Sequence, residues 1–218
     1  MLKIWSRQLL NNNPVTPPGP IGPSVYDVSG FSNSNYLSMP FVFNNADSWE
    51  MIMCYTAIDF GTQGMPRTLI MTQNADFGIR IDAGVGGYPN KEDMLAYIFG
   101  RNGNTFLSIT DYGIEPNVDF NVKHYIKLSY TNPKYEIYHS SDGIQWTRSI
   151  YKTSSSKTYT SSNMLIGAPS YSGYDQLAFN GTLHMAEWKI VADGVTYLDI
   201  PNGINPLTIV GNPTIVES

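Results

Sequence analysis

Short alternating segments separated by turn dipeptides constrain this fold more than any other feature of the sequence. From Val25 onward, apolar and polar side chains alternate in short runs, and Asn102-Gly103, Asp142-Gly143 and Asp193-Gly194 stand between such runs. These dipeptides tolerate the positive φ angles found at the tips of β-hairpins. Apart from one turn near Asn90–Met94, no segment sustains a capped helical period. Many short strands without an internal repeat predict an all-β antiparallel sandwich rather than a propeller.

The most apolar expected strand is Trp49–Phe60, which is apolar on both faces of its pleat. Such a strand must be covered on both sides, so it is predicted to lie centrally between two layers. Cys54 lies within it, and we expect an inert core thiol there. Further strands are expected at Tyr36–Phe43, Arg67–Thr72, Gly78–Ala83, Leu95–Gly100, Thr105–Thr110, Lys123–Tyr130, Lys134–Ser140, Thr147–Tyr151, Met164–Ala168, Phe179–Ala192 and Val195–Asp199.

The last long segment, Phe179–Ala192, changes its hydrophobic phase part of the way along. The side chains expected in the core move from odd to even positions, and this predicts a β-bulge near Ala186 or Glu187. A second bulge is expected at Gly181, where the chain changes direction. The residues expected to fill the interior are Leu183, Met185, Trp188 and Ile190.

The N-terminus is predicted to be an arm rather than part of the sandwich. Ser6–Gln8 interrupts its apolar residues and no small-residue cleavage site follows, so we expect no signal peptide. Pro14–Pro23 cannot join a helix or a sheet interior and should form an extended spacer of roughly 30 Å. The residues that would anchor the arm on another protein are Leu2, Ile4, Trp5, Leu9 and Leu10. The alternative is an ordinary frayed terminus.

The chain is accordingly divided into an anchor and spacer (1–24), a β-domain (25–200) and a C-terminal extension (201–218). Prolines at positions 201, 206 and 213 exclude a helix in that extension. It is expected either to add an edge strand at Leu207–Val210 or to reach a neighbouring molecule.

Composition excludes several classes of function. The chain has 13 Lys and Arg residues against 18 Asp and Glu residues, so its net charge is -5 and the basic surface of a nucleic-acid binder is missing. No stretch approaches the roughly 20 apolar residues that span a bilayer. A single cysteine excludes an internal disulfide and a cysteine-based zinc cluster. The low charged fraction, 14%, indicates a surface of Asn, Ser, Thr and Tyr side chains.

Motifs in both halves of the chain follow a recognisable order. In chain order they are Tyr36-Leu37, Ser48–Ile52, Thr68–Ile70, Gly78–Ile81, Lys123–Tyr130, Tyr135–Tyr138, Ser140–Thr147, Leu165–Gly167 and Phe179–Ile190. From about Val25 to Asp199 this series resembles the concanavalin A-like (laminin G-like) jelly-roll superfamily. The resemblance implies a two-sheet antiparallel jelly-roll sandwich, here with an extended N-terminal arm. Such domains also occur in bacteriophage virion proteins.

Because glycoside hydrolases share this fold, we searched for their catalytic residues. Cleavage needs two facing carboxyl groups, one of them protonated. The laminarinase-like E-x-D-x-x-E run is missing, Glu187 has no carboxylate partner in its strand, and no G-x-S-x-G motif is present. We therefore expect no enzyme and no cofactor. A rim calcium site could use Asp82, Asn90 and Asp93, but ordinary loop polarity explains these residues equally well.

Glycan binding asks only for aromatic faces and hydrogen-bonding groups on loops. The residues that supply these groups are Tyr88, Asn90, Tyr112, Trp146, Tyr171 and Tyr174. Two alternatives stay open: the tyrosines could fill an interface between subunits or on a particle, or could pack over the ends of the barrel.

The favoured function is therefore a non-enzymatic bacteriophage virion protein, a capsid decoration or fibre component. Its arm would hold it on other virion proteins, and its jelly roll would face outward and could contact host-surface glycans. We expect a homo-oligomer exposed on the particle surface. The alternative is a bacterial carbohydrate-binding module or lectin, and a glycoside hydrolase is the third hypothesis.

Overall fold

The structure is a computed structural model of the 218-residue chain. It describes residues 26–58, 61–62, 65–74, 77–83, 94–102, 105–106, 109–110, 121–153, 159, 161–169 and 177–217. Residues 1–25 lie outside the described part, so the anchor residues Leu2, Ile4, Trp5, Leu9 and Leu10, and the extended arm itself, stay predictions.

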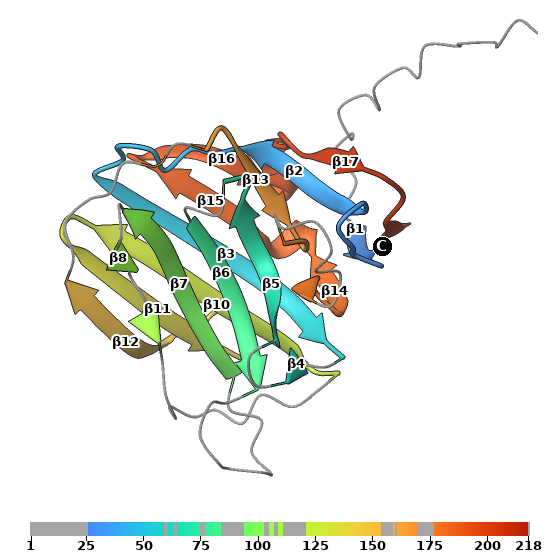
Figure 1. Cartoon of the computed structure of the whole chain (residues 1–218), viewed down its shortest axis with the longest axis horizontal. Helices are drawn as coiled ribbons and strands as arrows, with labels where there is room; N and C mark the ends of the chain where they lie inside the picture. Colours follow the sequence, from blue (N-terminus) through green and yellow to red (C-terminus); the bar gives the residue numbers. More distant parts are fainter. Residues whose placement is uncertain are drawn as a thin grey trace, which may run out of the picture.

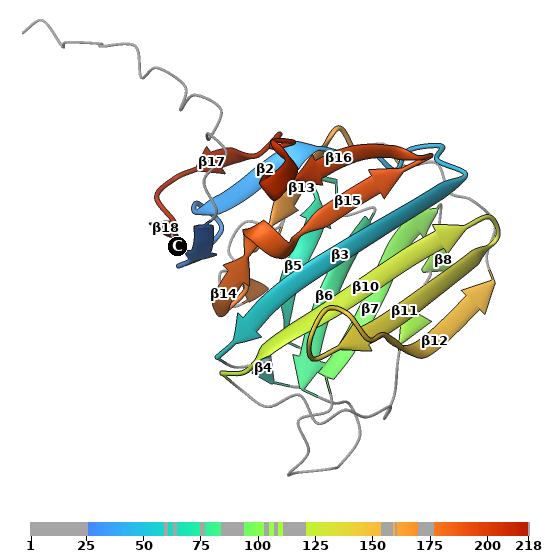
Figure 2. The same cartoon turned by 180° about the vertical axis from the view of Figure 1, so that it is seen from behind.

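Two antiparallel sheets pack face to face, as Figures 1 and 2 show from opposite sides. Sheet A has the strand order β12-β11-β10-β3-β14-β1-β18, with β15 paired to β3 and β16 paired to β15. Its strands are β1 Tyr26–Ser29, β3 Ser48–Ala57, β10 Lys123–Thr131, β11 Lys134–Ser140, β12 Thr147–Thr153, β14 Gly181–His184, β15 Lys189–Ala192, β16 Val195–Asp199 and β18 Thr214–Glu217. The predicted jelly-roll sandwich is confirmed.

Sheet B has the order β17-β2-β13-β5-β6-β7-β8, with β4 on β5 and β9 on β7. Its strands are β2 Tyr36–Pro40, β4 Gly61–Thr62, β5 Met65–Thr72, β6 Phe77–Ala83, β7 Met94–Asn102, β8 Thr105–Phe106, β9 Ile109–Thr110, β13 Asn163–Ile166 and β17 Thr208–Val210. Among the described residues, short 3-10 helices at η2 Met185–Glu187 and η3 Ile200–Asn202 interrupt the last third of the chain.

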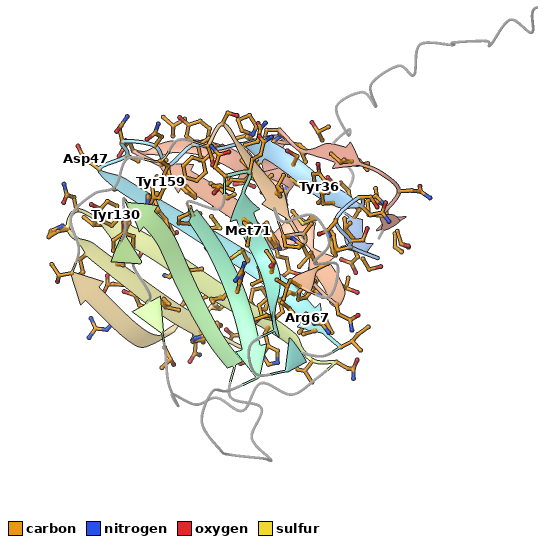
Figure 3. The ribbon with its side chains drawn as sticks, viewed as in Figure 1. Tyr36, Asp47, Arg67, Met71, Tyr130 and Tyr159 are labelled. Carbon is orange, nitrogen blue, oxygen red and sulfur yellow. The ribbon has the colours of Figure 1, made fainter. Side chains whose placement is uncertain are left out.

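An aromatic cluster fills the interior between the sheets. Phe43 stacks on Trp49 with ring centroids 4.7 Å apart, and Phe77 meets Trp49 edge-on at 5.9 Å. Tyr130 and Tyr159 are also buried, and they lie toward the end of the sandwich that carries Asp47 (Figure 3). Large rings from both sheets therefore stabilise the packing of the two layers. Each Å² of apolar surface removed from water contributes about 25 cal/mol to the free energy of folding.

Strand β3 is central in sheet A, but only one of its faces is fully covered. Trp49, Met51 and Met53 point into the sandwich and are buried, whereas Glu50 and Ile52 on the outer face are half-buried. The prediction of a layer on each side is therefore wrong for the outer face. The physical reason is that neighbouring side chains of the same sheet, rather than a further layer, cover the apolar residues there.

The phase change in the last long segment is confirmed, but the predicted β-bulge within a single strand is wrong, because a 3-10 helix divides the segment into two strands. Helix η2 interrupts the strand at Met185–Glu187, so β14 and β15 present different parities to the core. All four residues expected in the interior are buried: Leu183, Met185, Trp188 and Ile190. Gly181 has a φ of 155°, and a Cβ atom there would lie 2.1 Å from the carbonyl oxygen of Thr56. The register of β14 and β3 is regular there, so the bulge predicted at Gly181 is wrong, and the close approach of the two strands is what requires glycine.

Two predicted turns differ in form. Asp193 and Gly194 both have positive φ, 46° and 78°, and join β15 to β16 as a tight hairpin. Asp142-Gly143 instead belongs to a longer connection, Ser141–Trp146, between β11 and β12. Gly103 lies outside the described residues, so the third turn stays a prediction.

The C-terminal extension adds one edge strand to each sheet. Strand β17 pairs with β2 in sheet B, as predicted for Leu207–Val210, and β18 pairs with β1 in sheet A. Within the described part of the chain, no helix is long and apolar enough to cross a membrane.

Candidate functional site

A depression of 280 Å³ on the outer face of sheet A gathers charged and aromatic groups. It lies between the β11–β12 connection and the segment η2–β15. Its lining residues are Ile52, Tyr125, Asp142, Gly143, Ala186, Glu187, Trp188, Lys189 and Asp199. A larger hollow of 350 Å³ is lined mostly by small and apolar residues, and Arg67 is the charged residue among its described lining. Arg67 lies at the end of the sandwich opposite Asp47 (Figure 3). The first depression is lined by more charged and aromatic side chains, so we treat it as the candidate site.

Strand alternation places Tyr125 on the floor of the depression. In β10 the even-numbered residues Ile126 and Leu128 point into the core, so Tyr125 and Lys127 point outward. Tyr125 lies opposite Cys54 in the register of β10 and β3. Burial, together with a hydrogen bond to Glu187, raises the pKa of Tyr125, so its phenol stays protonated and remains a donor.

The first wall is a connection that hydrogen bonds hold in one shape. The Oδ1 atom of Asp142 accepts the N–H groups of Ile144 and Gln145, each at 2.8 Å, and the Ser140 hydroxyl at 2.9 Å. These N–H groups, that of Gln145 first, lower the pKa of Asp142. The connection folds back over the face of sheet A (Figure 2), so a Cβ at Gly143 would lie 2.8 Å from the Tyr125 ring. Ile144, 80% exposed, stands at its tip.

The second wall centres on Glu187 at the end of η2. Its carboxylate accepts hydrogen bonds from the Lys123 ammonium and the Tyr125 hydroxyl. Partial burial alone would raise the pKa of Glu187, but the hydrogen bonds from Lys123 and Tyr125 outweigh it and lower the pKa below its usual value. Glu187 is therefore ionised at neutral pH. From the sequence, Glu187 had no carboxylate partner in its strand; in the structure it is the central carboxylate of a polar cluster with Lys123 and Tyr125.

Behind this wall, Trp188 fixes the position of the segment. Its indole Nε1–H donates a hydrogen bond of 2.9 Å to the carbonyl oxygen of Cys54, and the side chain is buried. Next to it, Lys189 and Asp199 form an ion pair at 3.6 Å on the rim. Burial, and then the negative charge of Glu187, raises the pKa of the Cys54 thiol to about 12, so the thiol is protonated at neutral pH, as expected of an inert core cysteine.

Beside the depression, two aromatic rings flank a lysine. The Lys127 ammonium lies 4.6 Å from the ring centroid of Tyr138 and 4.9 Å from that of Trp146. Such cation–π contacts contribute about 0.5–1 kcal/mol at exposed sites. Trp146 is half-buried and is the last residue of the β11–β12 connection, which forms the first wall.

Of the residues predicted for glycan contact, only Trp146 lies in the described part of the chain, and the structure places it beside the depression. The others, Tyr88, Asn90, Tyr112, Tyr171 and Tyr174, lie outside the described residues and stay predictions. The same holds for Asn90 and Asp93 of the calcium alternative, while Asp82 belongs to β6. No group of three or more metal-ligating side chains occurs among the described residues.

Sequence reasoning missed Tyr125, Asp142, Glu187 and Lys189 as members of one site. The alternation in Lys123–Tyr130 was the one local signal that could have placed Tyr125 on the outer face. The position of Glu187 beside it depends on the pairing of β3 with both β10 and β15, which no local pattern reveals.

No protein-family model and no curated protein sequence matches this chain. Solved structures do match. A SAP-like pentraxin from Limulus polyphemus has a TM-score of 0.56 at 10% identity, over 91% of this chain and 97% of that one. A protein of Bacteroides ovatus proposed to bind carbohydrate has a TM-score of 0.55 at 15% identity, over 89% and 60%.

The CBM40 domain of the Ruminococcus gnavus IT-sialidase, solved with α2,3-sialyllactose, has a TM-score of 0.51 at 14% identity, over 79% of this chain and 93% of that one. At these identities the likeness concerns the fold and not the ligand. Together with the two-sheet topology, it identifies the architecture of this chain as the concanavalin A-like jelly roll.

Proposed function

We propose that this chain is a non-enzymatic carbohydrate-binding module whose site is the depression on the outer face of sheet A. The observation that carries the proposal is the combination of an aromatic floor, Tyr125, with a second ring, Trp146, beside walls rich in charged groups. Sugars present apolar C–H faces that stack on aromatic rings and hydroxyls that bond to charged and amide groups.

The walls are suited to binding because they are already ordered. Asp142 fixes the β11–β12 connection through two backbone hydrogen bonds, and Trp188 fixes the opposite wall through the Cys54 carbonyl. A ligand therefore loses little affinity to ordering the protein. Hydroxyl groups would find partners in the rim pair of Lys189 and Asp199.

The ionisation of the carboxylates supports binding rather than cleavage. A glycosidase needs one carboxyl group that stays protonated at its working pH. In this depression the pKa of Asp142 and that of Glu187 are both lowered, so each is an anion at neutral pH. The resulting expectation is that bound sugar is released unchanged.

Two of the similar folds point in the same direction. The Bacteroides ovatus protein is proposed to bind carbohydrate, and the CBM40 domain was solved with a sialylated trisaccharide. These names describe those proteins and support the choice of ligand class to test here.

A glycan array followed by titration calorimetry tests the proposal. We expect Trp146→Ala to weaken binding about tenfold or more, since a truncated anchor costs more than about 1 kcal/mol. Tyr36→Ala is the matched control, because Tyr36 is a half-buried ring on β2 of the other sheet and should leave affinity unchanged. An array without binding, or equal affinity of Trp146→Ala and the parent chain, would refute the site.

For the whole chain, the proposal places this module on a bacteriophage particle, as a decoration or fibre subunit with its jelly roll outward. Its support is the order of an apolar tag, a proline-rich spacer and a domain of low charge. Deletion of residues 1–23 is expected to leave the domain folded and to abolish co-sedimentation with particles. An unfolded truncated chain, or one that still sediments with particles, would contradict the tether. A homo-oligomer is part of the same prediction and is measured by light scattering.

A further inference from the structure

A second polar cluster crosses the outer face of sheet A on four adjacent strands. In the sheet order β10-β3-β14-β1, Lys123 pairs with Thr56, Thr56 pairs with Thr182, and Asp27 pairs with His184. Residues opposite one another in antiparallel strands project from the same face of the sheet. Four chemically reactive groups that are far apart in the sequence, Asp27, His184, Thr56 and Lys123, thereby lie on one face in a diagonal row, which steps two residues along β14 from Thr182 to His184.

Two hydrogen bonds link three members of this row. The Nδ1 atom of His184 lies 2.9 Å from Oδ1 of Asp27, and its Nε2 atom lies 2.8 Å from Oγ1 of Thr56. A carboxylate oxygen accepts hydrogen bonds, so the Nδ1–H group of His184 is the donor to Asp27. In the neutral ring Nε2 is then a lone-pair acceptor, and the Thr56 hydroxyl donates to it.

This arrangement is the one that activates a hydroxyl nucleophile. A base lies within hydrogen-bond reach of the hydroxyl, and a carboxylate on the other ring nitrogen holds the base in the required tautomer. We propose that Thr56 is an activated nucleophile that accepts the acyl group of small carboxylic esters, with His184 as its general base and Asp27 as the positioning residue.

The step balances within these residues. The Thr56 oxygen forms a bond to the ester carbonyl carbon while its proton passes to His184 Nε2. The bond from that carbon to the alcohol oxygen then breaks, and the proton leaves with the alcohol, so the products are acyl-Thr56 and free alcohol. Lys123 lies directly across from Thr56, and its ammonium stabilises the negative charge that develops on the carbonyl oxygen. One of its three N–H groups is committed to Glu187, which leaves two.

The row is open to a small ester. Thr56 and Thr182 are half-buried, the Lys123 and Asp27 side chains are 44% and 39% exposed, and the His184 side chain is 15% exposed. The Lys123 and Asp27 ends of the row are therefore open to solvent, while the imidazole between them is largely shielded. None of the three hydrogen-bonded residues lines the depression proposed for sugar, although Lys123 bonds Glu187 there, so variants at Thr56, His184 and Asp27 test this proposal apart from the sugar site.

The test is acetylation of the full chain by 4-nitrophenyl acetate, with 4-nitrophenolate release followed by absorbance and the acetylated residue mapped by peptide mass spectrometry. We expect one acetyl group per chain, on Thr56. His184→Asn should slow acetylation about 100-fold or more, the contribution of a general base. Asp27→Asn should slow it about tenfold or more, because the ring tautomer is no longer fixed.

Three further variants separate chemistry from folding. Thr56→Ser keeps a hydroxyl and should still be acetylated, whereas Thr56→Val has nearly the same shape and should not. Thr182→Ala, on the same face one strand away, is the matched control and should react like the parent chain. Each variant's unfolding midpoint is measured alongside. Acetyl groups mapped only to lysine, or an unchanged rate in folded His184→Asn, would show that the row merely ties the strands together and would overturn the proposal.

Discussion

Two histidines inside the sandwich make acid stability a direct test of the packing. His139 on β11 points toward the interior and is only 6% exposed, and His124 on β10 is 8% exposed. The ring of Tyr55 lies 6.3 Å from that of His124. Burial, and then the neighbouring His124, lowers the pKa of His139 from 6.5 to about 4. Protonation of His139 in the folded chain is therefore costly.

The sign and size of the effect follow from proton linkage. The folded pKa lies below the unfolded value, so the unfolded chain takes up the proton first as the pH falls. The contribution of His139 is fully present above pH 6.5 and is lost progressively down to about pH 4. At about 1.4 kcal/mol for each pKa unit, the free energy of unfolding falls by about 3 kcal/mol over that interval.

Urea unfolding followed by tryptophan fluorescence at a series of pH values measures this loss. In His139→Leu the group no longer titrates, so the difference between the variant and the parent chain should change by about 3 kcal/mol between pH 7 and pH 4. Ile137→Val, a buried methyl deletion on the same strand, is the control, and it should shift the whole curve by about 1 kcal/mol without changing its slope. Parallel curves for His139→Leu and the parent chain would refute the reasoning.

Three other predictions concern single contacts. Trp188→Phe should lower the free energy of unfolding by about 1–3 kcal/mol, because it leaves the buried Cys54 carbonyl without its indole donor; equal urea midpoints would contradict this. Gly181→Ala should cost several kcal/mol or prevent folding, since its Cβ would overlap the Thr56 carbonyl, whereas Gly194→Ala, with φ of 78° but open space, should cost only about 1 kcal/mol in the same thermal scans; equal losses would contradict the steric argument. Cys54 should resist iodoacetamide at pH 8 in the native chain and react in urea, because burial raises the pKa of its thiol to about 12; rapid native alkylation would show that the strand opens.

Local patterns in the sequence were sufficient for the elements and much of the core. Alternation and turn dipeptides predicted most strands, and the phase change near Glu187 correctly located an irregularity, which is the 3-10 helix η2 and not the predicted β-bulge. These features depend on neighbours a few residues apart, which is the range over which backbone geometry and side-chain period act. The two-layered cover of Trp49–Phe60 was predicted wrongly, because apolar composition does not say whether a second layer or adjacent side chains provide the burial.

The sequence by itself determined that the chain forms an antiparallel sandwich with turns at positions such as Asp193-Gly194. Only the tertiary structure decided which strands are neighbours, and therefore that Tyr125 meets Glu187 and that Thr56 meets His184. Strand order and register arise from the packing of whole sheets, which here brings together residues 62 and 128 positions apart in the sequence. The residues next to a reactive group in the sequence therefore do not show which distant side chain will lie beside it in the folded protein.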